Sequence, residues 1–236
     1  YIGLNKWLQK SGDEPVIIDK EKSESSKERL ERYYASYGYF NTEADYTVTP
    51  LEKKKKRAAI TYNVKRHQPY FVDSITKEIA SPVVDSLFQE SIANTFIKSG
   101  KQYDASDFVD ERDRLTIQFR NSGLFHFDQD YVGFEADTVN TGHKANIKYQ
   151  IPNREVTEGD STYTEPFKVH TVNEIRIVTD FSYENRNETP TDSVEYEGYK
   201  LYSFDKLKFN PKAITDAISI TPNSIFKDID RTLTYN

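Results

Sequence analysis

The sequence predicts an α+β protein made of tandem β-α-α-β-β modules, in which each module is a three-stranded mixed sheet with two helices packed on one face. Two repeated features lead to this prediction. An amphipathic helix that ends at a glycine occurs twice, 85 residues apart, and an alternating strand follows each copy at nearly the same interval. Self-similarity at a fixed period indicates an array of small domains rather than one large domain.

The repeated helix is clearest at residues 111–125, where the sequence ERDRLTIQFRNSGLF runs straight into a strand. Leu115 and Phe119 share one helical face because they are four residues apart, and Gly123 is free to adopt the positive φ that ends a helix. The first copy is KERLERYYASYGYF, residues 27–40. Its equivalent residues are Leu30, Tyr34 and Gly38.

The repeat extends to both sides of this helix. The alternating residues Ile60, Tyr62 and Val64 recur as Ile147, Tyr149 and Ile151. Upstream of the helix, the pattern Ile-x-x-Gly-x-x-Tyr at 97–103 resembles Ile-x-x-Asn-x-x-Phe at 220–226, and Val72 with Ile75 resembles Val172 with Ile175. The chain therefore contains two full or partial copies and the beginning of a third.

The first module is predicted at residues 1–66 and lacks its first strand. Residues 1–11 have apolar side chains close to helical spacing, 15–19 form a short apolar crossing, and Ser23, Ser25 or Ser26 caps the repeated helix. A strand at 40–49, a turn at 53–57 and an antiparallel strand at 58–65 complete the module.

The second module, residues 67–151, is predicted to be complete. It begins with a strand at 70–79 and a helix that starts after Ser81-Pro82 and runs to about Lys98. After Gly100 come the repeated helix, a strand at 125–138, and a strand at 145–151. The last strand is expected to pair with both of its neighbours, because the first strand reaches the hairpin only through a helical crossover.

Residues 152–166 (PNREVTEGDSTYTEP) are polar and aperiodic, which is typical of a linker or an extended loop. A third, truncated module is predicted at 167–236. It begins with a strand at 167–179, carries an insertion at 180–203 with a small surface hairpin around Glu197-Gly198, and continues with a helix at 211–220.

Composition excludes several classes of function. A net charge of −6 argues against a nucleic-acid partner, whose phosphates require a basic face. The chain has no cysteine, and its four histidines show no metal-ligand spacing, so we predict no metal and no cofactor. Nucleophile and phosphate-loop motifs are absent as well, and we predict no catalytic residues and no enzyme activity. The absence of methionine indicates a piece of a longer chain.

The repeat resembles the POTRA domain of the BamA/TamA outer-membrane assembly family. The resemblance rests on Gly-x-x-Tyr before the second helix, Arg-Leu inside it, and Ser-Gly-Leu-Phe or Tyr-Gly-Tyr-Phe at its end. Segments such as GDEPVIID and RHQPYFVDSI are most similar to the TamL branch of Bacteroidetes.

The resemblance implies a place on the periplasmic side of the bacterial outer membrane. It also implies a C-terminal β-barrel outside this sequence. The expected partners are a TamB-like periplasm-spanning protein or other subunits of the assembly machine, together with nascent outer-membrane proteins.

The expected working surface is the strand at 125–138, which the predicted strand order leaves at an edge of the sheet. Unpaired backbone groups at such an edge bind an extended peptide by β-augmentation. Phe127, Tyr131, Val132 and Phe134 would line this edge, and a proline at Val132 would remove one edge donor, provided that the N–H of Val132 points outward. Two alternatives stay open at this stage: these four side chains belong to the core, or the whole region is a passive spacer between a membrane anchor and a barrel.

Overall fold

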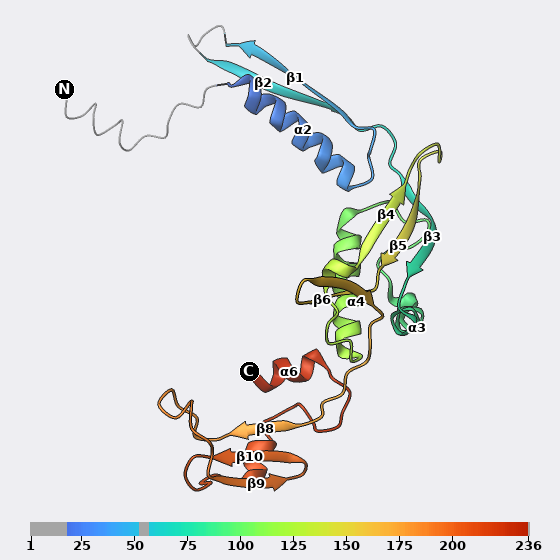
Figure 1. Cartoon of the computed structure of the whole chain (residues 1–236). Coiled ribbons are helices and arrows are strands. Elements are labelled where there is room, and N and C mark those ends of the chain that lie inside the picture. Colours follow the sequence, from blue (N-terminus) through green and yellow to red (C-terminus); the bar gives the residue numbers. More distant parts are fainter. Residues whose placement is uncertain (1–17, 52–56, 236) are drawn as a thin grey trace, which may run out of the picture. The chain divides into compact units, whose positions relative to one another are not determined.

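The computed structural model describes residues 18–51 and 57–235 (Figure 1). These residues form two compact units. Unit 1 contains the described residues up to Phe71 together with Gln102–Ala105, and unit 2 contains Val72–Lys101 and the residues from Ser106 onward. Most of the second predicted module and the whole of the third thus lie together in unit 2. The division into three modules stays a prediction.

Unit 1 is built from one helix and a hairpin. The helix α2 (Lys20–Ser36) is followed by the antiparallel strands β1 (Glu43–Pro50) and β2 (Ala58–Lys65), which pair from Glu43↔Lys65 to Pro50↔Ala58. The bounds of β2 are those predicted. The predicted helix at 1–11, most of the crossing at 15–19 and most of the turn at 53–57 lie outside the described residues.

The start of α2 corrects one prediction. Asp19, and not a serine, caps the helix: its Oδ1 accepts hydrogen bonds from the N–H groups of Glu21 (2.8 Å) and Lys22 (3.4 Å). Ser23 and Ser26 lie inside the helix, where their hydroxyl groups donate to carbonyls one turn earlier. An aspartate cap is favoured here because its charge also interacts with the helix dipole.

Replacing Asp19 by alanine removes this cap. We expect the free energy of unfolding of unit 1 to fall by about 1 kcal/mol, the usual cost of losing an N-terminal cap. Urea denaturation followed by circular dichroism measures the change. The variant Ser26→Ala is the control, since Ser26 makes only a bond within the helix. An equal effect of the two substitutions would contradict the assignment of Asp19 as the cap.

The first part of unit 2 is the predicted α+β module. It contains β3 (Phe71–Ile79), α3 (Pro82–Ser91), η1 (Ile92–Asn94), α4 (Ala105–Asn121), η2 (Gln129–Tyr131), β4 (Gly133–Asp137) and β5 (Lys144–Ile151). The sheet has the order β3-β5-β4, so the returning strand lies in the middle, as predicted. The first helix is shorter than predicted because η1 ends it before Lys98.

Both helices pack on the same face of this sheet. Along β5 every second residue is buried, from Ala145 to Ile151. Tyr149 on this face contacts Phe88 of α3 with ring centroids 4.9 Å apart, and its hydroxyl group donates to Glu111 of α4. The opposite face is polar, with pairs such as Glu78 with Lys148. This alternation is typical of a sheet that is covered on one side.

Residues 152–166 are not the extended loop that the sequence predicts. They form a hairpin of β6 (Arg154–Glu158) and β7 (Ser161–Glu165). Its two-residue connection is Gly159-Asp160, and Gly159 has a φ of +60°. Gly-Asp between two short runs containing Thr, Val and Tyr is a hairpin signal, so the sequence did contain the information.

The last part of unit 2 also differs from the prediction. Only β8 (Ile175–Val178) forms within the predicted strand 167–179. The hairpin of β9 (Asp192–Tyr196) and β10 (Tyr199–Ser203) turns at Glu197-Gly198 as predicted, yet it is not a surface insertion. β10 is the central strand of the sheet β8-β10-β9, parallel to β8 and antiparallel to β9. Every second residue of β10 is buried, namely Tyr199, Leu201 and Ser203.

Two short helices complete unit 2. α5 (Pro211–Thr215) begins at Asn210, whose side chain accepts from the N–H of Lys212, and it ends well before the predicted end at residue 220. α6 (Asp228–Tyr235) follows. None of the helices among the described residues has the length and apolar character needed to cross a membrane.

The repeated glycines have the role that the sequence predicts. Gly38 has a φ of +83° and Gly123 a φ of +94°, and each follows the end of a helix. In each copy the next N–H returns to the helix: Tyr39 donates to the Tyr34 carbonyl and Leu124 to the Phe119 carbonyl, both at 3.1 Å. These are the bonds of a Schellman cap, so the repeat is confirmed at the level of single hydrogen bonds.

Candidate functional site

The candidate site is the free edge of β4. The pairing runs from Gly133↔Gln150 to Asp137↔Asn146, and among the described residues β4 has a strand on one side only. A strand in this position presents unpaired N–H and C=O groups to an added strand. The prediction that this part of the chain forms a sheet edge is therefore confirmed, although the strand is shorter than predicted.

Most of the predicted strand 125–138 is not a strand. Residues 125–132 form turns and the short helix η2, and only Gly133–Asp137 pair with β5. Two side chains explain why residues 125–132 do not form a strand. They bond backbone groups that a strand would use to pair with its neighbour. The guanidinium group of Arg120 donates to the carbonyls of Phe125 (3.2 Å) and Phe127 (2.9 Å), and the Asp128 carboxylate accepts from the N–H of Asp130 (3.2 Å).

The four side chains predicted for the edge have different positions. Phe127 and Val132 are fully buried, with 0% and 1% exposure, and Phe127 packs against Phe119 and Phe167. Tyr131 is half-buried next to Phe127. These three precede the strand. The interpretation of Phe127 and Val132 as core residues, which the sequence left open, is the correct one.

The N–H of Val132 does not point outward. It donates to the carbonyl of Gln129 at 3.0 Å within η2, and the carbonyl of Val132 accepts from Nε of Arg112 at 3.0 Å. Both backbone groups of Val132 therefore have partners. A proline at this position would disturb the turn that leads into β4, and it would not test the edge.

Phe134 is the predicted residue that lies on the edge strand. Its ring is half-buried on the helix face, 5.1 Å from the rings of Phe108 and Tyr149, and the Arg112 guanidinium lies 5.7 Å from its centroid. Arg112 thus contacts both the carbonyl that precedes β4 and the first large side chain on it. This role of Arg112 has no signal in the sequence, because Val132 and Phe134 lie about 20 residues farther along the chain.

The backbone groups that face away from the sheet follow from the position of β5. The carbonyl of Ile151 accepts from the N–H of Ala80, directly after β3, at 2.9 Å, so the backbone groups of Ile151 face β3. Since backbone direction alternates along a strand, those of Gln150 and Lys148 face β4. Their partners Gly133 and Glu135 then face β5, and the N–H and C=O groups of Phe134 and Ala136 face outward. Ala136 is exposed.

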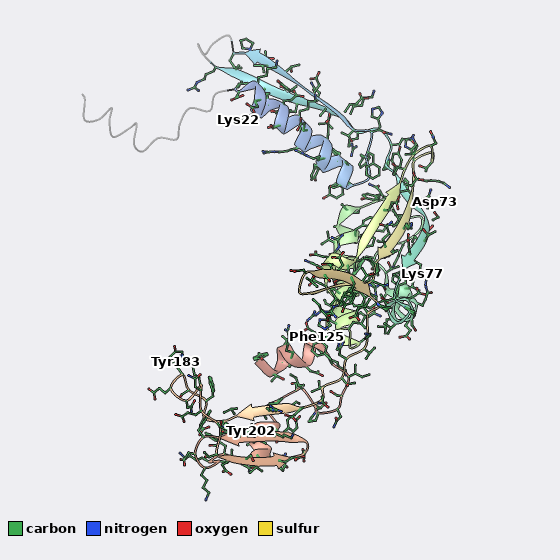
Figure 2. The ribbon with its side chains drawn as sticks, in the orientation of Figure 1. Lys22, Asp73, Lys77, Phe125, Tyr183 and Tyr202 are labelled. Atoms are coloured by element: carbon green, nitrogen blue, oxygen red, sulfur yellow. The ribbon has the colours of Figure 1, made fainter. Side chains whose placement is uncertain are left out.

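The other edge of the sheet is partly covered. Val72 of β3 exchanges hydrogen bonds with the 98–101 turn: its N–H donates to the Lys101 carbonyl at 2.8 Å, and its carbonyl accepts from the Gly100 N–H at 2.7 Å. Farther along β3, the charged residues Asp73 and Lys77, which Figure 2 labels, pair with Lys144 and Asp85. Because the 98–101 turn already bonds the backbone of Val72, the start of β3 is closed to an added strand, and β4 is the more accessible edge.

A buried polar cluster between α4 and the sheet lies next to β4. Glu111 of α4 has 0% exposure and accepts from Nε and Nη2 of Arg114 (3.0 and 2.7 Å), from the Phe96 N–H (3.0 Å) and from the Tyr149 hydroxyl (3.2 Å). Burial raises the pKa of the Tyr149 phenol well above its usual range. Tyr149 is the β5 partner of Phe134, so this cluster fixes the strand on which β4 lies.

The described residues contain no group of three or more His, Asp or Glu side chains that could hold a metal ion. The open hollows on unit 2 are shallow and lined mainly by polar residues. One of about 530 Å³ lies between α4 and α6, next to the ion pair of Arg120 and Asp228. The backbone edge of β4 remains the feature best suited to bind a macromolecule.

Comparison with known proteins finds similarity to one family in part of the chain. Residues 5–66 match the model of the POTRA family, described as a surface antigen variable number repeat. No curated protein matches the sequence. Two similar solved structures come from BamA.

The first of these is a crystal structure of POTRA domains 3–5 of Haemophilus influenzae BamA, with 12% identity, a TM-score of 0.40 and coverage of 89% of this chain and 66% of that one. The second is BamA of Haemophilus ducreyi lacking POTRA domains 1–3, with 17% identity, a TM-score of 0.36 and coverage of 65% and 27%. The chain thus spans less than two thirds of the length of either structure.

Proposed function

We propose that this region is a POTRA string of an outer-membrane assembly factor, which binds extended segments of other proteins at the free edge of β4. The proposal rests on the POTRA repeat at residues 5–66 and on the outward backbone groups of Phe134 and Ala136. It places the region on the periplasmic side of the outer membrane. It assigns no catalytic residue and no cofactor.

The ligand class follows from the chemistry of a sheet edge. Main-chain hydrogen bonds provide affinity without requiring one sequence, which suits a partner that handles many substrates. Segments of nascent outer-membrane proteins have about ten residues of alternating apolar and polar character and are extended before they insert. A TamB-like protein, as in the TamL branch, is the second expected partner. β4 pairs over five residues, so it would hold a short part of such a strand.

A proline at Ala136 tests the proposal. It removes an outward N–H while the bonds between β4 and β5 remain, because proline is tolerated on edge strands when the missing N–H faces solvent. We expect the affinity for a synthetic ten-residue peptide of alternating valine and threonine to fall about tenfold, the equivalent of one lost main-chain bond with its steric cost. Fluorescence anisotropy of the labelled peptide measures the affinity.

Two controls make this experiment specific. Ala136→Ser changes the side chain at the same position but keeps the N–H, so its affinity should equal that of the parent. Glu135→Pro removes an N–H that faces β5, so it should lower the melting temperature. If Ala136→Pro, shown to be folded, binds the peptide as well as Ala136→Ser does, the edge of β4 is not the binding site.

A second candidate function is the passive spacer. One observation favours it: Gly123 is in tight contact with Val169 and Ile225, which couples the end of α4 to the last part of unit 2. A spacer requires fixed geometry and no ligand. Photo-crosslinking from position 135 in cells distinguishes the two functions, because a spacer yields no adducts with partner proteins.

A further inference from the structure

The glycine that follows each repeated helix is the centre of a hydrogen-bonded arrangement, which we call the glycine junction. In the first junction, within unit 1, the carbonyl of Gly38 accepts from the Tyr70 N–H (2.9 Å), and the carbonyl of Tyr70 accepts from the Tyr103 N–H (2.9 Å). An aromatic ring covers it: Phe40 contacts both Tyr70 and Tyr103.

The second glycine junction, within unit 2, repeats every one of these contacts. The carbonyl of Gly123 accepts from the His170 N–H (2.8 Å), and the carbonyl of His170 accepts from the Phe226 N–H (2.9 Å). Phe125 covers it, with its ring 5.0 Å from Phe226 and 6.0 Å from His170. Figure 2 labels Phe125 at this place in the fold.

Tyr103 of the first junction corresponds to Phe226 of the second, and the two junctions also differ in one pair of contacting side chains. In the first, Asn41 follows the covering aromatic residue, and its Nδ2 donates to the Tyr70 hydroxyl at 3.3 Å. In the second, the equivalent residues are His126 and His170, with ring centroids 5.0 Å apart and rings nearly perpendicular. A pair that stays uncharged across the physiological pH range is thus replaced by two imidazole rings, the side-chain group whose usual pKa lies between pH 5 and 8.

We propose that protonation of the His126–His170 pair loosens the second glycine junction at mildly acidic pH, while the first junction is unaffected. The geometry supports this in two ways. Two imidazolium rings at this separation repel each other. The Nδ1 atom of His170 is buried and has no hydrogen-bond partner among the described residues, so a proton there would be an unsatisfied buried donor.

The charged groups around the pair also disfavour protonation. Partial desolvation of the otherwise exposed His126 lowers its pKa, with Arg154 and His170 acting in the same direction, while Glu165 opposes them. Glu165 is itself paired with Arg154 (3.1 Å) and Lys168 (3.0 Å), which weakens its effect on the histidine. From α4, Arg120 bonds the carbonyls on both sides of His126 and pairs with Asp228 of α6.

The direction of the pH effect follows from this shift. Since the pKa of His126 in the closed junction is below its usual value of 6.5, the junction has its full stability above pH 6.5. Stability is lost as the pH falls from 6.5 towards the lowered pKa. Within that window the closed-to-open ratio falls by at most about tenfold per pH unit through protonation of His126. Because His126 is exposed, we expect salt to reduce the effect.

Hydrogen exchange of two amides in the whole chain tests the proposal. The N–H groups of His170 and Tyr70 make the equivalent bond in the two junctions, so Tyr70 is an internal reference. We expect the protection factor of His170, corrected for intrinsic exchange, to fall severalfold or more between pH 7.5 and 5.5. That of Tyr70 should stay within about twofold.

Exchanging the side chains between junctions completes the test. The double variant His126→Asn/His170→Tyr copies the first junction and should remove the pH dependence at residue 170. The single variant His126→Gln should reduce the pH dependence of exchange at residue 170. It provides an independent measurement if the double variant is unstable. The proposal is overturned if the protection of His170 does not change with pH, if it changes in parallel with Tyr70, or if the histidine-free junction keeps the full pH dependence.

Discussion

Replacing Glu111 by alanine is expected to lower the free energy of unfolding of unit 2 by about 3–5 kcal/mol, the cost of breaking a buried ion pair by removing one partner. Glu111 has 0% exposure and accepts four hydrogen bonds. Without it, the Arg114 guanidinium, the Phe96 N–H and the Tyr149 hydroxyl lose an acceptor. Buried donors without acceptors are more costly than the bond itself is stabilising.

An exposed ion pair provides the matched control. Asp85 of α3 pairs with Lys77, but the side chains retain 41% and 32% of their exposure. Such a pair contributes at most about 1 kcal/mol, so Asp85→Ala should have a small effect. Urea denaturation of both variants measures the difference. If Glu111→Ala costs no more than Asp85→Ala, the cluster is not a buried network that fixes Tyr149 and the strand β5.

Replacing Gly123 by valine is expected to destabilise unit 2 by about 3 kcal/mol or more. One part of this cost is the φ of +94°, which an L-residue adopts with a strain of about 1–2 kcal/mol. The other part is steric overlap, which adds about 1–3 kcal/mol. A Cβ atom at this position would lie 2.6 Å from Cγ1 of Val169 and 2.9 Å from Cγ2 of Ile225.

Gly100 allows the backbone strain to be measured without the steric overlap. It has a similar φ of +81°, and a Cβ atom there meets no atom within 4 Å. Gly100→Ala should therefore show the backbone strain alone, and Gly123→Ala should cost more. In the Gly123→Ala background, the second substitution Val169→Ala removes the closest side-chain atom. It should recover part of the stability lost relative to Gly100→Ala. Equal unfolding curves for Gly100→Ala and Gly123→Ala would contradict the close packing at the second glycine junction.

The features that the sequence predicted correctly are local ones. The glycine after each helix needs only its own backbone freedom, and the helix face of Leu115 and Phe119 depends only on spacing. β2 alternates over its whole length and has the predicted bounds. The order β3-β5-β4 follows from the crossover that two helices impose.

The features that the sequence missed depend on contacts between distant residues. Residues 125–132 have the apolar content of a strand, but Arg120 and Asp128 hold their carbonyl and N–H groups in turns. The hairpin β9–β10 resembles a surface hairpin until β10 pairs with β8, about 25 residues away along the chain. The sequence pattern also predicts Phe127 and Val132 on the edge strand, because their burial depends on contacts with distant residues. In the fold they are core residues.

The most direct test of the proposed function is amide hydrogen exchange along β4 with and without the alternating valine-threonine peptide. If the peptide adds a strand to the edge, the outward N–H groups of Phe134 and Ala136 become protected by about tenfold or more at saturating peptide. The N–H groups of Gly133 and Glu135, which already face β5, should change little. Binding that leaves Phe134 and Ala136 unprotected, or that protects β3 or β9 instead, would contradict the account.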